Sequence, residues 1–148
     1  MFKFGRSKRA IIKTGGLVIL LSVFLGACKG TPTEQSITEI TWKWTSLEET
    51  EPAAQSVVPN PGQYTLLLQP DGSINLQVDC NMASGEYSLD GEALSIEVGP
   101  STMAFCGEES LDLLYLELLS KVERYEPGDG QLILLLADGT GRMTFGEK

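Results

Sequence analysis

The residue with the clearest chemistry in this chain is Cys28, at the end of a short apolar run that follows a basic N-terminus. Residues 25–28, Leu-Gly-Ala-Cys, have the form of a lipobox, in which cleavage after Ala27 leaves a thiol that can carry a diacylglycerol. The apolar run, 17–25, is much shorter than the roughly 20 residues that span a bilayer. We therefore predict that residues 1–27 are the signal peptide of a bacterial lipoprotein, cleaved between Ala27 and Cys28.

Other kinds of chemistry are limited by composition, because the chain has no histidine. That absence excludes Ser-His-Asp and Cys-His nucleophilic sites, histidine-ligated zinc and acid–base catalysis by imidazole. The acidic residues are scattered through turns and polar faces, and no pair lies in an apolar context that would raise a pKa. There is also no glycine-rich phosphate loop and no Cys-x-x-Cys pair. We predict a protein that is not an enzyme and that uses no cofactor and no metal.

The charge of the mature chain is strongly negative. Removal of residues 1–27 would leave 121 residues, the size of one domain, with six basic and all twenty acidic residues, a net charge of −14. Such a chain lacks the basic surface that binds nucleic acid, and anionic lipid headgroups would repel it, so the lipid must hold it at the membrane. We interpret the acidity as a soluble, non-adhesive surface, with binding of a basic protein or peptide as the alternative. We expect a monomer.

Residues 28–37 contain the lipidated cysteine and a polar, proline-containing segment, so we predict that they form a flexible tether. The folded domain is then 38–148, and it starts where Trp42 and Trp44 alternate with polar residues in a strand with one buried face. We expect both tryptophans in the core, with an aromatic lining for a ligand cavity as the alternative.

Short runs of alternating apolar and polar residues, separated by turn residues such as Asp-Gly, predict further antiparallel strands. Residues 46–62, with three glutamates and three prolines, are expected to form a long exposed loop. Leucines at helical spacing predict one amphipathic helix over 111–122, with Ser110 as its N-cap. The strands that we expect after the first are 64–69, 74–79, 85–89, 93–98, 122–126, 131–137 and 140–145.

These elements predict a mainly β domain of about eight antiparallel strands, with the helix inserted between the fifth and the sixth. A closed or nearly closed barrel is expected because closure removes exposed strand edges. The helix would plug one end or lie across the wall.

Residues 79–87, Asp-Cys-Asn-Met-Ala-Ser-Gly-Glu-Tyr, resemble the Gly-Cys-Asn and Gly-x-Tyr elements of the META domain family, also called HslJ-like. Thr102 to Cys106 is similar to that family's Thr-x-x-x-Cys element, and the leucine-rich helix follows in the family's order. The resemblance covers roughly 38–146 and departs at Asp79, where the family usually has glycine. It implies a small β-barrel-like fold, often in envelope lipoproteins, an association with heat-shock and antibiotic-stress responses, and no established chemistry.

We interpret the motif residues as structural. Asn81 is expected to be a turn residue whose side chain bonds nearby backbone, with a ligand contact as the alternative. Gly85 is expected to supply a special φ angle, and Tyr87 to pack with its hydroxyl bonded. Thr102 belongs to the same structural motif.

Two cysteines remain once Cys28 is lipidated, in a compartment outside the cytosol where disulfides persist. Cys80 continues the apolar parity of strand 74–79, so we expect its side chain to face the core. We predict a disulfide between Cys80 and Cys106, with Cα atoms about 4.4–6.8 Å apart. Two buried thiols that act as small hydrophobes are the alternative.

Together these features predict a lipid-anchored, non-catalytic envelope protein with a structural or protein-interaction role in envelope and antibiotic-stress tolerance. The alternatives are a calyx for a small apolar ligand and an inhibitor of a basic secreted hydrolase such as a lysozyme. We expect an extracytoplasmic location on the cell membrane. In a host with two membranes we expect the outer one, because Lys29 replaces the aspartate that commonly retains lipoproteins at the inner membrane.

Overall fold

The computed structural model describes residues 37–128 and 130–148, and these belong to one compact unit. The predictions for the signal peptide, for Cys28 and for most of the tether concern residues 1–36, outside the described residues. In the part of the chain that the structure describes, no helix has the length and apolar character needed to cross a membrane.

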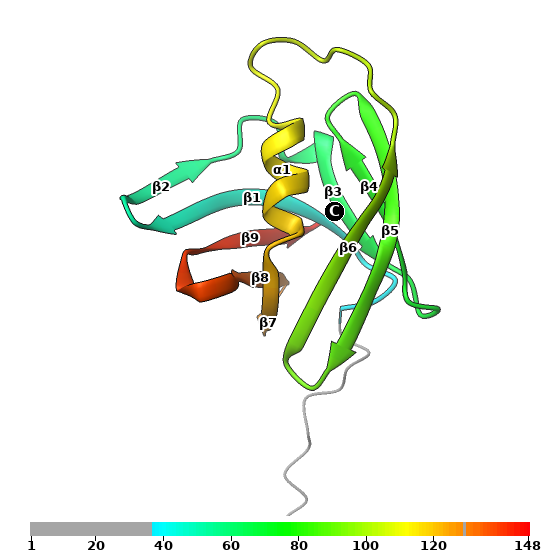
Figure 1. The fold of residues 1–148 in the computed structure, drawn as a ribbon, viewed down its shortest axis with the longest axis vertical. Helices are drawn as coiled ribbons and strands as arrows, with labels where there is room; N and C mark the ends of the chain where they lie inside the picture. Colours follow the sequence, from blue (N-terminus) through cyan, green and yellow to red (C-terminus); the bar gives the residue numbers. More distant parts are fainter. Residues whose placement is uncertain (1–36, 129) are drawn as a thin grey trace, which may run out of the picture. The chain divides into compact units, whose positions relative to one another are not determined.

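The domain is a nine-stranded antiparallel sheet in which the strands follow sequence order from β3 to β9 (Figure 1). β1 pairs with β2, with β3 and with β9, and the β1–β9 pairing closes the sheet into a ring. The strands are β1 (Thr41–Thr50), β2 (Ala53–Val57), β3 (Tyr64–Leu68), β4 (Ser73–Val78), β5 (Asn81–Asp90), β6 (Ala93–Ser101), β7 (Val122–Gly128), β8 (Gln131–Leu136) and β9 (Gly141–Glu147). Two short 3₁₀ turns precede β3 and β9, η2 (Pro61–Gln63) and η3 (Ala137–Gly139).

The predicted fold class, mainly β with a single helix and a closed sheet, is confirmed, with one strand more than expected. The expected loop 46–62 contains the second half of β1 and all of β2, which pair from Ser46↔Val57 to Thr50↔Ala53. All five residues of β2 are exposed, so no alternation of apolar and polar residues marks this strand in the sequence. Backbone pairing with β1 forms the strand here, without burial of a hydrophobic face.

The one α-helix of the described residues, α1 (Asp112–Leu119), lies between β6 and β7 and is shorter than the predicted 111–122. It ends early because Val122 is already the first residue of β7. The N-cap position is Leu111, not Ser110 as predicted, although the Ser110 hydroxyl accepts a bond from the Asp112 backbone N–H at 3.3 Å. The helix buries three side chains in the ring, those of Tyr115, Leu118 and Leu119.

Aromatic side chains fill the interior between α1 and the ring. Trp42 and Trp44 are both buried, as predicted for the core. The Tyr115 ring stacks on Trp44 with centroids 5.3 Å apart, and it lies 5.7 Å from Tyr64 and 6.4 Å from Phe145. Rings from β1, β3 and β9 therefore meet the helix at one point. Such aromatic pairs add about 0.5–1.5 kcal/mol each beyond the burial of their area.

The N-terminal boundary of the folded part differs by one residue from the predicted one. Ile37, which we placed at the end of the tether, is buried in the core. Its carbonyl accepts a hydrogen bond from the Trp42 indole N–H at 2.9 Å. The core therefore begins before β1, at a residue that no alternation of apolar and polar residues marks in the sequence.

The hydroxyl of Tyr115 is the one buried side-chain nitrogen or oxygen among the described residues that has no hydrogen-bond partner. Burial also raises the pKa of this tyrosine well above its ordinary value, because the phenolate cannot be solvated there. Tyr115 thus contributes its ring to the core, while its hydroxyl carries a desolvation cost.

Tyr115→Phe should leave the free energy of unfolding at pH 7 unchanged or raise it by about 1 kcal/mol, because it removes an unsatisfied buried hydroxyl. Above about pH 10 the tyrosine ionises in the unfolded chain, while buried Tyr115 stays protonated in the folded protein. The free energy of unfolding of the wild type should therefore fall by about 1.4 kcal/mol per pH unit relative to that of Tyr115→Phe. The stability due to the raised pKa is therefore present below pH ~10 and lost as the pH rises above it. Urea denaturation at neutral and alkaline pH measures both effects.

Tyr87→Phe is the matched control. The Tyr87 hydroxyl donates to the Gln69 carbonyl at 2.8 Å, so this substitution should lower the free energy of unfolding at pH 7 by about 1 kcal/mol. A comparable loss in Tyr115→Phe would mean that the Tyr115 hydroxyl has a partner in solution, and the interpretation above would be wrong.

Candidate interaction surface at the disulfide loop

The segment 101–111, which we call the disulfide loop, connects the end of β6 to α1 and arches over the helix N-terminus (Figure 1). A disulfide joins its Cys106 to Cys80, with Cα atoms 5.6 Å apart. The predicted disulfide and its Cα separation are therefore confirmed. The link closes 26 residues of sequence separation, for which chain-entropy models give about 3–4 kcal/mol of stabilisation.

The prediction that Cys80 faces the core is wrong, because Cys80 is exposed at the rim of the sheet. Asp79 adopts φ +58°, in the left-handed region, and this turns the chain between β4 and β5 and ends the parity of β4. Glycine tolerates that conformation best, in line with the glycine of the motif that this segment resembles. In this chain Asp79 is held by the Tyr64 hydroxyl, 3.2 Å from its Oδ2.

Asn81 attaches the disulfide loop to the sheet. Its side chain is almost fully buried, and its Oδ1 accepts bonds from the Ala104 N–H at 2.8 Å and from the Thr102 hydroxyl at 3.0 Å. Its Nδ2 donates to the Ala104 carbonyl at 3.0 Å and to Cys106 Sγ at 3.2 Å. Thr102 Oγ1 in turn accepts from the Met82 N–H at 3.0 Å. Asn81 and Thr102 therefore bind backbone 20 or more residues away, and Asn81 does not bond the nearby turn that we expected.

Gly85 has a role different from the predicted special φ angle, since its φ is not positive. A Cβ atom at this position would lie 2.2 Å from the Glu97 carbonyl oxygen. The register of β5 and β6 shifts between Ala83 and Gly85, and the bulged strand comes too close for a side chain. Tyr87 is as predicted, half-buried with its hydroxyl bonded.

A groove of about 590 Å³ lies between the disulfide loop and the first turns of α1. Three large apolar side chains at this groove are strongly exposed, Met103 by 91%, Phe105 by 84% and Leu113 by 75%. Val78 and Leu116 are also apolar and line it from β4 and from α1. Isolated apolar residues are normal on a surface, but a contiguous patch around a groove is typical of an interaction site.

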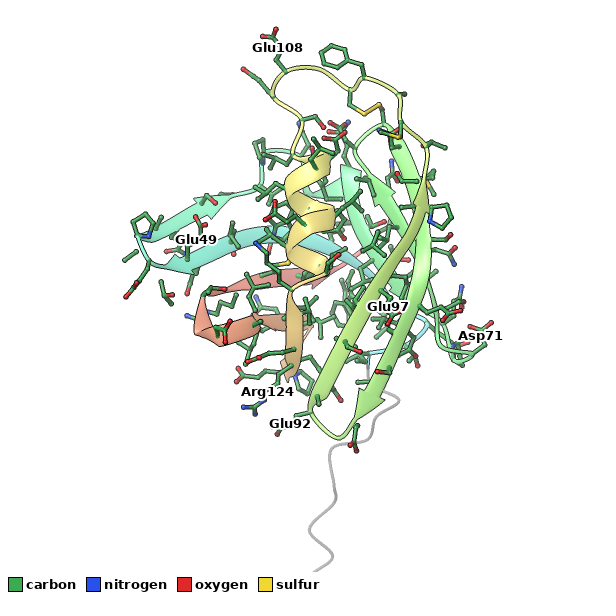
Figure 2. All side chains as sticks on the ribbon, in the orientation of Figure 1. Glu49, Asp71, Glu92, Glu97, Glu108 and Arg124 are labelled. Atoms are coloured by element: carbon green, nitrogen blue, oxygen red, sulfur yellow. A yellow bond between two sulfur atoms is a disulfide. The ribbon has the colours of Figure 1, made fainter. Side chains whose placement is uncertain are left out.

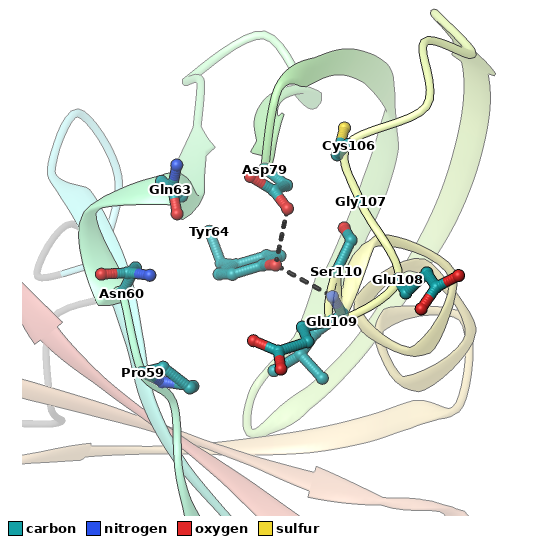
Figure 3. A pocket seen from close by; sticks show the side chains of 11 residues that line it. Pro59, Asn60, Gln63, Tyr64, Asp79, Cys106, Gly107, Glu108, Glu109 and Ser110 are labelled. Atoms are coloured by element: carbon teal, nitrogen blue, oxygen red, sulfur yellow. Dashed lines mark hydrogen bonds between the residues drawn. The ribbon is translucent and has the colours of Figure 1, made fainter.

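A second hollow, of about 400 Å³, adjoins the groove and is polar (Figure 3). The Tyr64 hydroxyl lies in it, donating to Asp79 and accepting the Leu111 N–H at 2.9 Å. Glu108 and Glu109 project around its mouth. The two hollows share part of the disulfide loop, the residues Cys106, Gly107, Glu108 and Ser110.

The charges around both hollows have one sign. The carboxylates that line them are Asp79, Glu108, Glu109 and Asp112, and no lysine or arginine is among the lining residues. Ion pairs elsewhere in the described residues involve Lys121, Arg124 and Arg142. Figure 2 shows Glu108 at the tip of the loop, far from the Arg124–Glu92 pair.

Two further observations concern metal ligation and ionisation in the part of the chain that the structure describes. No group of three or more His, Cys, Asp or Glu side chains is placed to hold a metal ion within residues 37–128 and 130–148. The one carboxyl group there with a clearly shifted pKa is Asp71, an exposed turn residue. Its pKa is lowered by hydrogen bonds from the Ser73 side chain and backbone, as in an ordinary Asx turn.

Sequence reasoning identified the residues that build this surface but not those that are exposed on it. It selected Asn81, Thr102 and Cys106 through the family motif, and all three lie together. It passed over Met103 and Phe105, which occupy the variable positions of the Thr-x-x-x-Cys element. The one signal in the sequence is that two large apolar residues occur in a segment with no strand or helix period.

Comparison with known proteins places this fold in a family. Residues 35–148 match the family model of the META domain. The chain belongs to the META domain family. A search of curated proteins found no match to this chain.

Solved structures share the fold of this META domain. A protein from Burkholderia xenovorans, determined by NMR, has 25% identity and a TM-score of 0.62 and covers 77% of this chain and 85% of its own. A DUF4847 family protein from Bacteroides vulgatus, a crystal structure, has 12% identity and a TM-score of 0.60 and covers 76% of this chain and 95% of its own. The second likeness, at that identity, concerns the fold alone.

Asn81→Asp tests whether Asn81 attaches the loop. The change replaces the Nδ2 donor with an oxygen that faces the Ala104 carbonyl and Cys106 Sγ, so the free energy of unfolding at pH 7 should fall by about 3 kcal/mol. The control Asn75→Asp, at an exposed position of the neighbouring strand, should change it by less than about 0.5 kcal/mol. Denaturation with the disulfide intact measures both, and equal effects would contradict the assignment.

Proposed function

We propose that this META domain protein is a lipid-anchored, non-catalytic protein of the bacterial cell envelope that binds a protein partner through the surface around the disulfide loop. Its role would be in envelope and antibiotic-stress tolerance, in line with what the family resemblance implies. The observation that carries the proposed binding role is the strong exposure of Met103 and Phe105 on a loop that Asn81 and a disulfide hold in place.

The sequence around Cys28 supports the lipid anchor, through the basic segment, the short apolar run and the small residues before the cysteine. The Cys80–Cys106 disulfide supports a location outside the cytosol, where such bonds persist. The acidic composition supports an anchor too, since the domain has no basic surface that would hold it at anionic headgroups.

The energetics of the loop support binding over a purely structural role. Exposed aromatic and methionine side chains reduce the solubility of a domain, and they are enriched at protein–protein interfaces. A loop already held by four Asn81 bonds and a disulfide loses little conformational freedom on binding, which leaves more of the contact energy for affinity.

The alternatives of the sequence analysis receive unequal support. A calyx inside the ring is not favoured, because Trp42, Trp44, Tyr115 and Phe145 occupy the interior with almost no exposed area. An inhibitor of a basic secreted hydrolase remains a special case of protein binding, and the acidic groove is compatible with it. Lysozyme activity that stays unaltered at a high molar excess of this protein would remove that case.

The lipid anchor predicts a defined modification. In cells supplied with an alkyne fatty acid, the wild-type chain should take up the label, and mass spectrometry should find residue 28 as a lipid-modified N-terminus. Cys28→Ala should abolish both, because Cys28 is the cysteine directly after the cleavage site. Cys106→Ala should keep the label at residue 28, since Cys106 lies in the folded domain and not at the cleavage site. An unlabelled wild type, or a labelled Cys28→Ala chain, would contradict the anchor.

The binding role predicts a partner that touches one surface only. A photo-crosslinking amino acid at position 103 in living cells should give a discrete protein adduct, because this side chain is exposed beside the groove. The same amino acid at position 71, in the exposed turn between β3 and β4, should not give that adduct. No adduct at 103, or the same adduct from both positions, would argue against this surface.

A further inference from the structure

We propose, resting on the proposed function, that the partner presents a basic segment with an apolar side chain at its centre. The apolar side chain would enter the groove between Met103, Phe105 and Leu113. Lysine or arginine residues beside it would lie against Glu108 and Glu109. This assigns the chemistry of the ligand as well as the surface that receives it.

The surface of the groove is mostly apolar. Its walls present Met103, Phe105, Leu113, Leu116 and Val78, and the first three are mostly exposed in the described structure. Burying such side chains against a partner stabilises the complex by about 25 cal/mol per Å² of apolar area removed from water. Methionine also adapts to the shape of the side chain that it meets. The occupant therefore needs a large apolar side chain.

Carboxylates lie at the groove and at the polar hollow that adjoins it: Glu108 and Asp112 line the groove, and Glu108, Glu109 and Asp79 line the hollow. Asp112 already accepts the N–H of Leu113 at 2.7 Å, and Asp79 accepts the Tyr64 hydroxyl. Glu108 and Glu109 have no hydrogen bond or ion pair within the described part of the chain, and both are exposed. Two uncompensated carboxylates, Glu108 at the groove and Glu109 in the adjoining hollow, favour an occupant with positive charges next to its apolar side chain.

Charge also distinguishes this occupant from a membrane and from a second copy. Anionic headgroups would be repelled by the four carboxylates of the two hollows, so the exposed apolar side chains do not suit membrane insertion. The described residues contain five basic and eighteen acidic side chains, so two copies that meet at this surface would bring like charges together.

The test uses the full, anchored chain in vesicles of zwitterionic phosphatidylcholine, with empty vesicles as the blank. The probe is the fluorescent hexapeptide Lys-Lys-Phe-Leu-Lys-Lys, and its binding is read by anisotropy at low salt. We expect it to bind the protein-containing vesicles. We expect Glu-Glu-Phe-Leu-Glu-Glu and Lys-Lys-Ser-Ser-Lys-Lys to bind at least tenfold more weakly, because each lacks one half of the recognised chemistry.

Variants of the chain assign the two halves to their residues. Phe105→Ser should weaken binding of the basic peptide at least tenfold, and Glu108→Gln with Glu109→Gln at least fivefold. The matched control is Glu86→Gln with Glu97→Gln, an exposed cross-strand pair on β5 and β6 that removes the same charge elsewhere. It should change binding less than twofold, and raising the salt should remove most of the difference between the two double variants.

Each other outcome overturns the proposal in a recognisable way. If the basic peptide binds empty vesicles as strongly as protein-containing ones, the peptide is binding the membrane and not the protein. If the chain self-associates and peptide binding is lost only when it does so, a second copy occupies the groove. Equal binding of the acidic peptide, or equal effects of the two glutamate pairs, refutes the charge assignment. If no peptide binds while position 103 still gives its adduct in cells, only the partner's chemistry is wrong and the binding role stands.

Discussion

The strands of the ring are paired least between β6 and β7, the two strands that flank α1 in the chain. β6 and β7 share a single register pair, Ala93↔Arg124, whereas neighbouring strands elsewhere pair over at least three residues. Backbone hydrogen bonds therefore contribute little between β6 and β7. The helix inserted there places Tyr115 against Trp44 of β1 and within reach of rings from β3 and β9. The position of α1, and with it that of the disulfide loop, follows from this aromatic contact.

The disulfide loop is held at both ends by different physical means. Its C-terminal end continues into α1, which the aromatic contact fixes, and its middle is bound to the sheet by the Asn81 amide and the Cys80–Cys106 link. A loop with so many internal bonds does not need its apolar side chains for its own packing. Met103 and Phe105 are therefore free to face outward, at a cost in solubility that the rest of the surface must offset.

The acidity of the domain has two separate consequences. Over most of the surface it gives a net charge far from zero, which keeps a protein with an exposed apolar patch soluble. Around the two hollows the acidic Glu108 and Glu109 lie close to apolar side chains, and no lysine or arginine lines either hollow. Under the proposal above, solubility and the preference for a basic partner would both come from acidic side chains.

The sequence by itself determined the features that depend on local periodicity and on covalent chemistry. Alternation along 74–78 and the Asp-Gly turns predicted strands and hairpins, and the cysteine count predicted the disulfide. Tertiary structure decided the rest. β2 forms through pairing alone and has no buried face, and Cys80 leaves the core because Asp79 turns the chain. Met103 and Phe105 are exposed because residues more than 20 positions away hold their loop, and no local pattern encodes such a contact.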